Sequence, residues 1–330
     1  DSAAVTFAVP DELASAFAFA PGQTLTVRRG DERRSYSICA PAGAAPRIGV
    51  REVAGGAVSS WLVRTVHPGD TVEAQVPSGR FTPDLATPAH HVLLAAGSGI
   101  TPMISIVATV LAADDRSTVT LIYGNRRSDT VMFADEVADL KDAHPARMRI
   151  VHVLSREPQE VELFSGRLDP GKLRALLPVT AELAAVDHWW LCGPFAMVND
   201  AVDVLTELGV ERSRVHRELF WVGDDPPVET THTDAPVGDG ASVTVVLDGR
   251  SSTLTVPAGS TVLDAAQKVR PDLPFACKGG VCGTCRARLV HGEARMRRNY
   301  ALEPDELDAG YVLTCQTLPV SDEITVDFDV

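Results

Sequence analysis

Four cysteines near the C-terminal end of the chain have a spacing that suits iron–sulfur chemistry. Cys277, Cys282 and Cys285 follow the pattern C-x4-C-x2-C, and Cys315 comes further along the chain. This is the plant-type pattern for a [2Fe–2S] cluster, in which four thiolates hold two irons. The four cysteines are therefore the predicted metal ligands.

Zinc, a disulfide or unrelated core thiols could also account for these cysteines. Structural zinc is usually held by two C-x2-C knuckles, and Cys315 has no Cys or His close to it in the sequence. A disulfide is disfavoured because no secretory segment is visible. Four unrelated core cysteines rarely fall into this register. Gly279, Gly280 and Gly283 favour the cluster, because they permit tight turns with positive φ and leave N–H groups free to face sulfur.

A second group of residues, in the first quarter of the chain, suits a flavin dinucleotide. An arginine can hold phosphate, a tyrosine can stack on a flat ring, and a Gly-rich turn that opens a helix offers N–H groups to a diphosphate. Ser37 can hydrogen-bond the N5 edge of the flavin. The simpler alternative is a half-exposed strand face. The predicted flavin contacts are Arg34, Ser35, Tyr36, Ser37, Gly56, Val58 and Ser59.

A third group suits a pyridine nucleotide. The segment from Ala95 to Pro102 joins a predicted strand to a predicted helix, and open α/β sheets bind ligands at the carboxyl ends of their strands. A tight turn without a ligand remains the alternative. A later strand ends in a similar way and can line the nicotinamide pocket, although Cys192 equally suits a core position. The predicted contacts are Gly97, Gly99, Thr101, Pro102, Cys192, Gly193 and Pro194.

Arginines after two of the predicted strands bear on the choice between NADPH and NADH. Ser155 and Arg156 follow the third strand of the α/β region, and Arg126 and Arg127 follow the second. A guanidinium with a hydroxyl suits a 2′-phosphate, whereas NAD-binding sites usually place a carboxylate there. We therefore expect NADPH rather than NADH, with solvated surface arginines as the alternative.

The elements that position these residues fall into three predicted domains. Residues 1–87 contain short strands and one short helix, which predicts a small antiparallel β-barrel. Residues 88–222 alternate strands and helices, which predicts a five-stranded parallel sheet with helices on both faces. Residues 223–241 are a linker by composition. Residues 242–330 begin with a hairpin around Asp248-Gly249 and form an α+β unit that holds the cysteines.

Individual elements can also be predicted. Strands are expected at 5–9, 23–29, 34–39, 48–53, 71–76, 92–96, 119–123, 149–154, 188–192, 214–219, 243–247, 253–256 and 323–328. Helices are expected at 58–66, 102–112, 131–142, 170–177, 195–208 and 262–269.

Composition narrows the classes of partner. The chain of 330 residues has 45% hydrophobic and 22% charged residues, which is ordinary for globular proteins. A net charge of −14 argues against nucleic acid or anionic lipid as a partner. No apolar run is long enough to span a membrane and no signal segment is visible, so a cytoplasmic location is expected. Cys39 and Cys192 lie in apolar settings and are expected to be reduced thiols.

Several segments resemble the reductase subunits of phenylacetyl-CoA epoxidases, which belong to the ferredoxin–NADP reductase superfamily and are fused to a plant-type ferredoxin. The resemblance covers essentially the whole chain. Family members have one more β-strand before the segment that begins here at Asp1, which bears on closure of the barrel. The chain starts at Asp1 rather than Met, which leaves open whether further residues precede it. The similar segments are 34–39, 95–103, 121–126, 276–285, 299–307 and 310–316, of which 121–126 adds Asn125 and Arg126 to the expected nucleotide contacts.

The resemblance implies a function in electron transfer. NADPH would pass hydride to FAD, and single electrons would leave through the cluster to a di-iron oxygenase that epoxidises the ring of phenylacetyl-CoA. FAD rather than FMN is implied only by the resemblance. Ser37, Cys192 and Phe220 are candidates for the flavin and nicotinamide pocket, and Phe220 equally suits core or interdomain packing. The alternatives are a reductase for a Rieske-type ring or steroid hydroxylase and a zinc-binding module without enzymatic activity.

Overall fold

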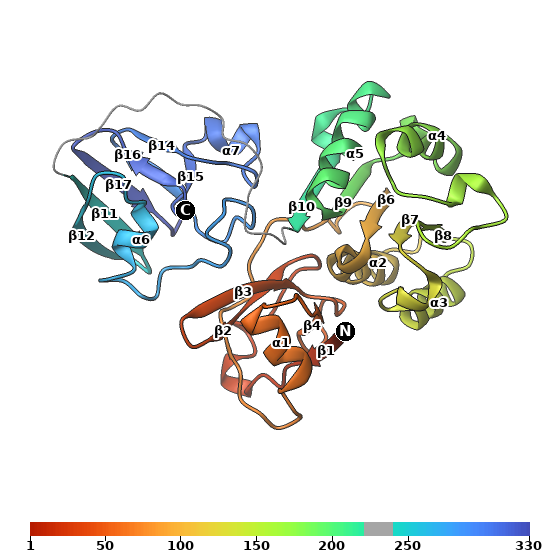
Figure 1. Ribbon diagram of the computed structural model, residues 1–330, viewed down its shortest axis with the longest axis horizontal. Coiled ribbons are helices and arrows are strands. Elements are labelled where there is room, and N and C mark those ends of the chain that lie inside the picture. The colour runs from red at the N-terminus through yellow and green to blue at the C-terminus, as the bar shows by residue number, and fades with distance from the viewer. Residues whose placement is uncertain (221–239) are drawn as a thin grey trace. The chain divides into compact units, whose positions relative to one another are not determined.

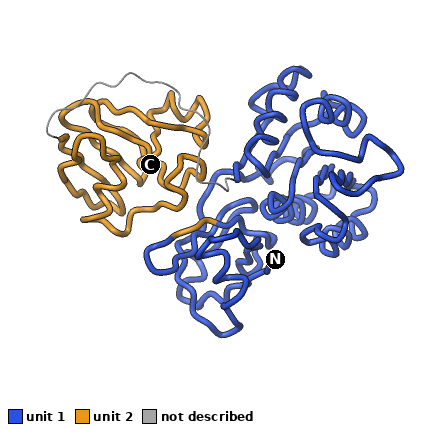
Figure 2. The backbone as a smooth tube through the Cα atoms, in the orientation of Figure 1, with its two compact units in different colours: residues 1–32, 36–221 blue, residues 33–35, 222–330 orange. Residues whose placement is uncertain are grey.

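The computed structural model describes residues 1–220 and 240–330. The chain divides into two compact units, one of residues 1–32 and 36–221 and the other of residues 33–35 and 222–330 (Figure 2). Most of the expected linker, residues 223–239, lies outside the described residues. Its last residue, Ala241, is already the first residue of strand β11 (Ala241–Leu247).

The N-terminal strands form the expected antiparallel arrangement. Strand β1 (Ser2–Thr6) pairs with β4 (Arg47–Arg51), while β3 (Glu32–Ser37), β2 (Thr24–Arg29) and β5 (Glu73–Ala74) form a second small sheet. An isolated bridge between Ile38 and Ile48 joins the two sheets. One apolar core fills the space between them and helix α1 (Ala57–Arg64); its buried members include Leu25, Val27, Ile48, Val50, Val58 and Leu62.

Strand β1 begins and ends earlier than predicted, at Ser2–Thr6 instead of 5–9. Its partner β4 runs from Arg47 to Arg51, so that Thr6 lies opposite Arg47. Pro46 precedes β4 and has no N–H group to continue the ladder. The pairing partner, rather than the apolar run in β1 itself, therefore sets the limits of this strand.

The parallel sheet predicted for the middle of the chain is confirmed. Its strands are β6 (His90–Ala96), β7 (Thr118–Asn125), β8 (Met148–Leu154), β9 (His188–Pro194) and β10 (Val215–Phe220). All neighbours are parallel, in the order β10-β9-β6-β7-β8. After β6 the chain adds β7 and β8 on one side of that strand, and later adds β9 and β10 on its other side. In open α/β sheets, the ligand crevice lies at such a reversal, which here falls between the carboxyl ends of β6 and β9.

Four helices connect these strands (Figure 1). They are α2 (Ile100–Ala113), α3 (Ala134–Ala143), α4 (Pro170–Thr180) and α5 (Phe195–Glu207). Helix α3 starts three residues later than predicted, because Phe133 has a left-handed backbone with φ of 57°. Helix α2 also packs towards the N-terminal strands, where Ser105 Oγ donates a hydrogen bond of 2.6 Å to the Ala40 carbonyl. The two parts therefore share one compact unit.

The C-terminal unit is built on a mixed five-stranded sheet. Its order is β12-β11-β17-β13-β15, with β11 and β17 parallel and the other pairs antiparallel. The predicted hairpin at Asp248-Gly249 is present, and both residues have positive φ. The predicted helix at 262–269 ends at Ala266. The other elements are β12 (Arg250–Val256), α6 (Val262–Ala266), β13 (Arg286–His291), β14 (Ala294–Met296), α7 (Pro304–Asp308), β15 (Tyr311–Leu313), β16 (Thr317–Pro319) and β17 (Glu323–Asp327).

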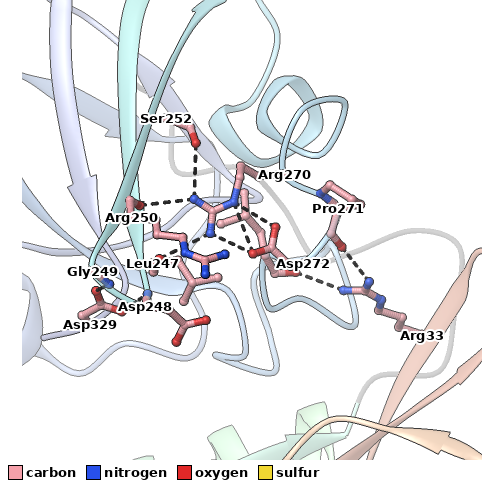
Figure 3. A network of polar contacts seen from close by, with 11 residues as sticks. Arg33, Leu247, Asp248, Gly249, Arg250, Ser252, Arg270, Pro271, Asp272 and Asp329 are labelled. Carbon is pink, nitrogen blue, oxygen red and sulfur yellow. Dashed lines mark hydrogen bonds and ion pairs between the residues drawn. The ribbon is translucent and has the colours of Figure 1, made fainter.

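Arg270 ties the hairpin to the segment that leads to the cysteine loop (Figure 3). Its guanidinium pairs with Asp272 at 2.8 Å and donates hydrogen bonds to the carbonyls of Arg250 and Leu247. The side chain of Arg270 is 12% exposed. Hydrogen bonding from Arg270 lowers the pKa of Asp272.

None of the helices in the described part of the chain combines the length and apolar character that a membrane crossing demands.

We expect Arg270→Ala to lower the free energy of unfolding of the C-terminal unit by about 1–2 kcal/mol, since charge-assisted hydrogen bonds and packing are lost together. Urea unfolding followed by circular dichroism measures this change. Arg250→Ala is the matched control, because the Arg250 side chain is exposed and acts on Asp272 only at longer range, while the Arg250 carbonyl, which the substitution keeps, accepts from Arg270. Equal destabilisation by both variants would contradict the assignment.

Candidate functional site

The four predicted metal ligands come together in the C-terminal unit. The Cys277 and Cys282 thiols are close enough to act on each other's pKa, and so are those of Cys285 and Cys315. Within the described residues, no three His, Cys, Asp or Glu side chains are grouped to hold a single metal ion. Sulfurs that converge as two pairs suit two irons, each with two thiolates, better than one tetrahedral zinc.

Backbone amides and one glutamine side chain surround the sulfurs. The N–H groups of Gly279 and Cys282 donate to Cys277 Sγ at 3.3 and 3.4 Å. Gln316 Nε2 lies 3.6 Å from Cys315 Sγ. Hydrogen bonding from Cys282, together with backbone amides, lowers the pKa of the Cys277 thiol. The loop is thus arranged to accept negative charge on sulfur, as thiolate ligands require.

The cysteine pairs differ in exposure. Cys277 and Cys282 are exposed, whereas Cys285 and Cys315 are buried. The loop can bend this tightly because Gly280 has φ of 78°, and a Cβ at this position would lie 3.1 Å from the Gln316 side chain and 3.2 Å from the Arg298 carbonyl oxygen. One side of the predicted cluster therefore faces the surface of its own unit.

The glycine turn after β6 lies against the end of β9. A Cβ on Gly99 would lie 2.1 Å from the Cys192 carbonyl oxygen, so only glycine permits this approach. Tyr123 Oη donates to the Gly97 carbonyl at 3.0 Å, and Thr101 Oγ1 donates to the Ser98 carbonyl at 2.9 Å. The structure thus places Gly99 against Cys192, while the expected contacts of Gly97, Gly99, Thr101 and Cys192 with a nucleotide stay a prediction.

Two features of this crevice fit a nucleotide. Asn125 Nδ2, at the end of β7, is buried and has no partner with good hydrogen-bond geometry in the described structure, although the Asn125 side chain lies close enough to the Tyr123 hydroxyl to act on its pKa. A buried amide of this kind calls for a ligand or a water. Arg51, which the sequence analysis did not select, extends to within 3.6 Å of the position that a Cβ on Gly97 would take. A groove of about 360 Å³ elsewhere on the sheet, at its amino-terminal edge, contains none of the predicted site residues.

The predicted flavin residues are placed less uniformly. Tyr36 is half-buried and packs on the core of the strands. Gly56 caps α1, while Val58 is buried and can offer only its backbone. Ser59 Oγ accepts from the Val53 N–H at 3.1 Å and so stabilises the turn itself. The start of α1 retains the unpaired N–H groups of any first helical turn, and the turn fits a diphosphate through its backbone.

Ser37, Cys192 and Glu218 meet at the carboxyl edge of the parallel sheet. Ser37 Oγ donates to Glu218 Oε2 at 2.8 Å, and Cys192 Sγ lies 3.9 Å from the same oxygen. Burial raises the pKa of Glu218 to about 7. Burial, and then the Glu218 carboxyl, raises the pKa of the Cys192 thiol. This arrangement can hold or release a proton near neutral pH.

Glu218 was not among the residues predicted from the sequence, although Phe220, two residues later, was. A single glutamate in a strand carries no local signal, and only the pairing of β10 with β9 brings it to Cys192. Phe220 itself packs against the core of the parallel sheet. Its expected place over a flavin therefore stays a prediction.

The predicted 2′-phosphate residues lie together. The Ser155 N–H donates to the Asn125 carbonyl at 2.9 Å, and the Arg156 N–H donates to the Arg126 carbonyl at 2.8 Å. Arg126 and Arg156 are exposed and neither guanidinium pairs with a carboxylate of the described chain. Arg127 differs, since it pairs with Asp129 at 3.2 Å. Two adjacent arginines with a serine fit a phosphate.

Comparison with protein families identifies two domains of the chain. Residues 93–203 match the oxidoreductase NAD-binding domain, and residues 245–320 match the 2Fe-2S iron-sulfur cluster binding domain.

Full-length relatives carry the comparison further. The chain is 41% identical to a subunit of 1,2-phenylacetyl-CoA epoxidase from Escherichia coli K12, over 100% of this chain and 94% of that protein. It is 34% identical to the 3-ketosteroid-9-alpha-monooxygenase ferredoxin reductase component of Rhodococcus rhodochrous, over 99% and 93%. Phthalate dioxygenase reductase shares its fold, with a TM-score of 0.58, 24% identity and coverage of 99% and 92%.

Glu218 gives the chain a pH-dependent stability. Its pKa is raised from 4.5 to about 7, so the folded state binds this proton more tightly than the unfolded state. Its contribution to stability is greatest below pH 4.5 and is lost as the pH rises to 7. We expect the free energy of unfolding of Glu218→Gln, relative to the unsubstituted chain, to increase across this range and then level off.

Urea titrations at several pH values, followed by tryptophan fluorescence, measure this difference. Glu160→Gln, at an exposed position of the same unit, is the matched control. A difference between Glu218→Gln and the unsubstituted chain that does not change with pH would show that Glu218 titrates in its ordinary range.

Proposed function

Since the chain belongs to the family of oxygenase reductases that includes the matched subunit of 1,2-phenylacetyl-CoA epoxidase and the ferredoxin reductase component of 3-ketosteroid-9-alpha-monooxygenase, we propose that it supplies electrons to a di-iron epoxidase of phenylacetyl-CoA. The protein is an NAD(P)H-dependent oxidoreductase that works with FAD, a [2Fe-2S] cluster and an oxygenase partner. The full-length identity of 41% to the epoxidase protein carries the choice of partner.

The cofactors supply the redox chemistry: flavin takes a hydride from pyridine nucleotide, and an iron–sulfur cluster carries single electrons. The chain's own residues bind and orient these groups. The Gly97–Gly99 turn, supported by Tyr123, offers backbone at the crevice where a nucleotide diphosphate approaches. The unpaired Asn125 amide supplies a hydrogen-bond donor beside it.

The Ser37, Cys192 and Glu218 cluster handles a proton in this proposal. Release of both electrons from a hydride also releases one proton, which needs an acceptor in the site. Ser37 donates to Glu218 at 2.8 Å, and the Glu218 pKa of about 7 suits a group that takes up and releases a proton at neutral pH. The buried Cys192 thiol stays protonated, because its pKa is raised.

The choice of NADPH is supported by the charges at the end of β7 and β8. Arg126 and Arg156 are adjacent, exposed and not paired with a carboxylate within the described residues. Glu157 is close by, but its carboxylate accepts hydrogen bonds from the Ser128 N–H and hydroxyl. The arginines are thus available to a 2′-phosphate.

A second candidate partner is a Rieske-type steroid or ring hydroxylase. The 34% identity to the reductase component of a ketosteroid monooxygenase favours this partner, and the fold is shared with phthalate dioxygenase reductase. Reconstitution with each purified oxygenase separates the two, since only the correct partner couples NADPH oxidation to product.

We expect Cys282→Ser to abolish electron delivery through the cluster while NADPH still bleaches the flavin. Cys282 belongs to the exposed sulfur pair, and replacing its thiolate removes one ligand of the cluster. Flavin absorbance and cytochrome c reduction measure the two steps separately. Cys39→Ser is the matched control, because the Cys39 thiol donates to the Arg47 carbonyl outside the cluster loop. Undiminished cytochrome c reduction by Cys282→Ser would rule out this route.

We expect Arg156→Ala to raise the KM for NADPH about 10-fold or more, because a charge-assisted contact to the 2′-phosphate is lost. The KM for NADH should change less than about 2-fold, because NADH has no such phosphate. Steady-state kinetics with both nucleotides measure the split. Arg116→Ala, in an exposed pair with Asp114, serves as the control, and equal effects on both nucleotides would remove the role assigned to Arg156.

A further inference from the structure

A concentration of positive charge lies beside the cysteine loop of an acidic protein. Residues 278–298 contain six Lys or Arg and a single acidic residue, Glu293, whereas the whole chain carries a net charge of −14. Three of the basic residues lie close together in the sequence: Arg295, Arg297 and Arg298. We call these three residues the arginine strip.

The backbone holds the arginine strip against the cysteine loop. The Arg297 N–H donates to the Gln316 carbonyl at 2.9 Å, and Gln316 Nε2 donates to the Lys278 carbonyl at 2.7 Å. The Tyr300 N–H donates to the Gly280 carbonyl at 3.0 Å. The strip therefore runs alongside the loop that carries the exposed Cys277 and Cys282.

Within the described residues, carboxylates form ion pairs with other basic groups in this region but none with Arg297 or Arg298, although the Asp264 carboxylate also interacts with Arg297 at longer range. Lys278 pairs with Asp264 at 2.9 Å, and Arg286 pairs with Glu306 of α7 at 3.1 Å. Arg297 is exposed and its guanidinium bonds the Gly259 carbonyl, which carries no charge. Arg298 is half-buried, and its side chain has no polar partner in the described structure.

We propose that the arginine strip binds an acidic surface of the oxygenase component that receives electrons from the exposed Cys277–Cys282 side of the cluster. This inference rests on the proposed function. Oppositely charged patches accelerate encounter between separate proteins by about 10- to 1,000-fold. The flavin and cluster units belong to one chain, so electron transfer between them does not depend on a charge-accelerated encounter of two molecules. The partner that binds the arginine strip is therefore the oxygenase component, which is a separate protein.

The test uses the full-length protein with its cofactors and two surrogate acceptors of opposite charge, the acidic cytochrome b5 and the basic cytochrome c. The variant is Arg297→Glu combined with Arg298→Glu, and Arg297→Gln combined with Arg298→Gln is a milder second variant. Arg250→Glu is the matched control, since Arg250 is exposed at the start of β12, at the opposite edge of the sheet from β15.

At low salt, we expect the double Glu variant to reduce cytochrome b5 about 10-fold more slowly and cytochrome c faster than the unsubstituted protein. The Gln variant should show changes of the same sign but smaller size, and all differences should shrink at high salt. The binding of cytochrome b5 to the oxidised reductase should weaken in parallel. Arg250→Glu should stay within about 2-fold of the unsubstituted protein for both acceptors.

Opposite effects on the two acceptors separate docking from a change in the cluster, since a changed driving force or cluster content shifts both rates in the same direction. Rates that move together, or a control that behaves like the strip variants, would overturn the proposal. A slower reduction of the cluster by NADPH, with unchanged delivery to cytochrome b5, would place the strip against the chain's own flavin unit and also overturn it. Failure of NADPH to reduce the cluster in the unsubstituted protein would instead refute the proposed function.

Discussion

The convergence of four cysteine sulfurs in one small volume is the constraint on which the electron path depends. Three of them come from a single loop, and Cys315 arrives from the turn after β15. Backbone amides at Gly279 and Cys282 and the Gln316 side chain surround the sulfurs. Because thiolates repel one another, such donors are needed before the metal can gather them. The short strands and the α6 helix of this unit position the loop.

The parallel sheet solves a different problem, which is to bring residues from distant parts of the chain to one edge. Gly99 after β6 and Cys192 in β9 are in backbone contact, and Glu218 in β10 joins them through strand pairing. The hydroxyl of Ser37 comes from the strand β3 and reaches the same carboxylate. Parallel strands place all their carboxyl ends together, so one edge of the sheet collects the glycine turn and the Ser37, Cys192 and Glu218 cluster.

Electrostatics divides the molecule into regions with different tasks. The chain as a whole is acidic, which disfavours nucleic acid and anionic membranes as partners. Local arginines interrupt this charge at Arg126 and Arg156, where a phosphate fits, and at the arginine strip beside the cysteine loop. The two basic regions differ in structure, since the first lies at the end of two parallel strands and the second along an extended segment tied to Gln316.

The sequence by itself determined the features that depend on local spacing. The C-x4-C-x2-C loop, the glycine turn after β6, the order of strands and helices and the Asp248-Gly249 hairpin are all visible as short patterns, because each is built from residues close together in the chain. Only the tertiary structure decided which distant groups meet. Glu218 and Arg51 carry no local signal, and the limits of β1 depend on Pro46 in the segment before its partner. A strand pattern reports which faces are buried, whereas the choice of neighbour across the sheet comes from long-range pairing and packing.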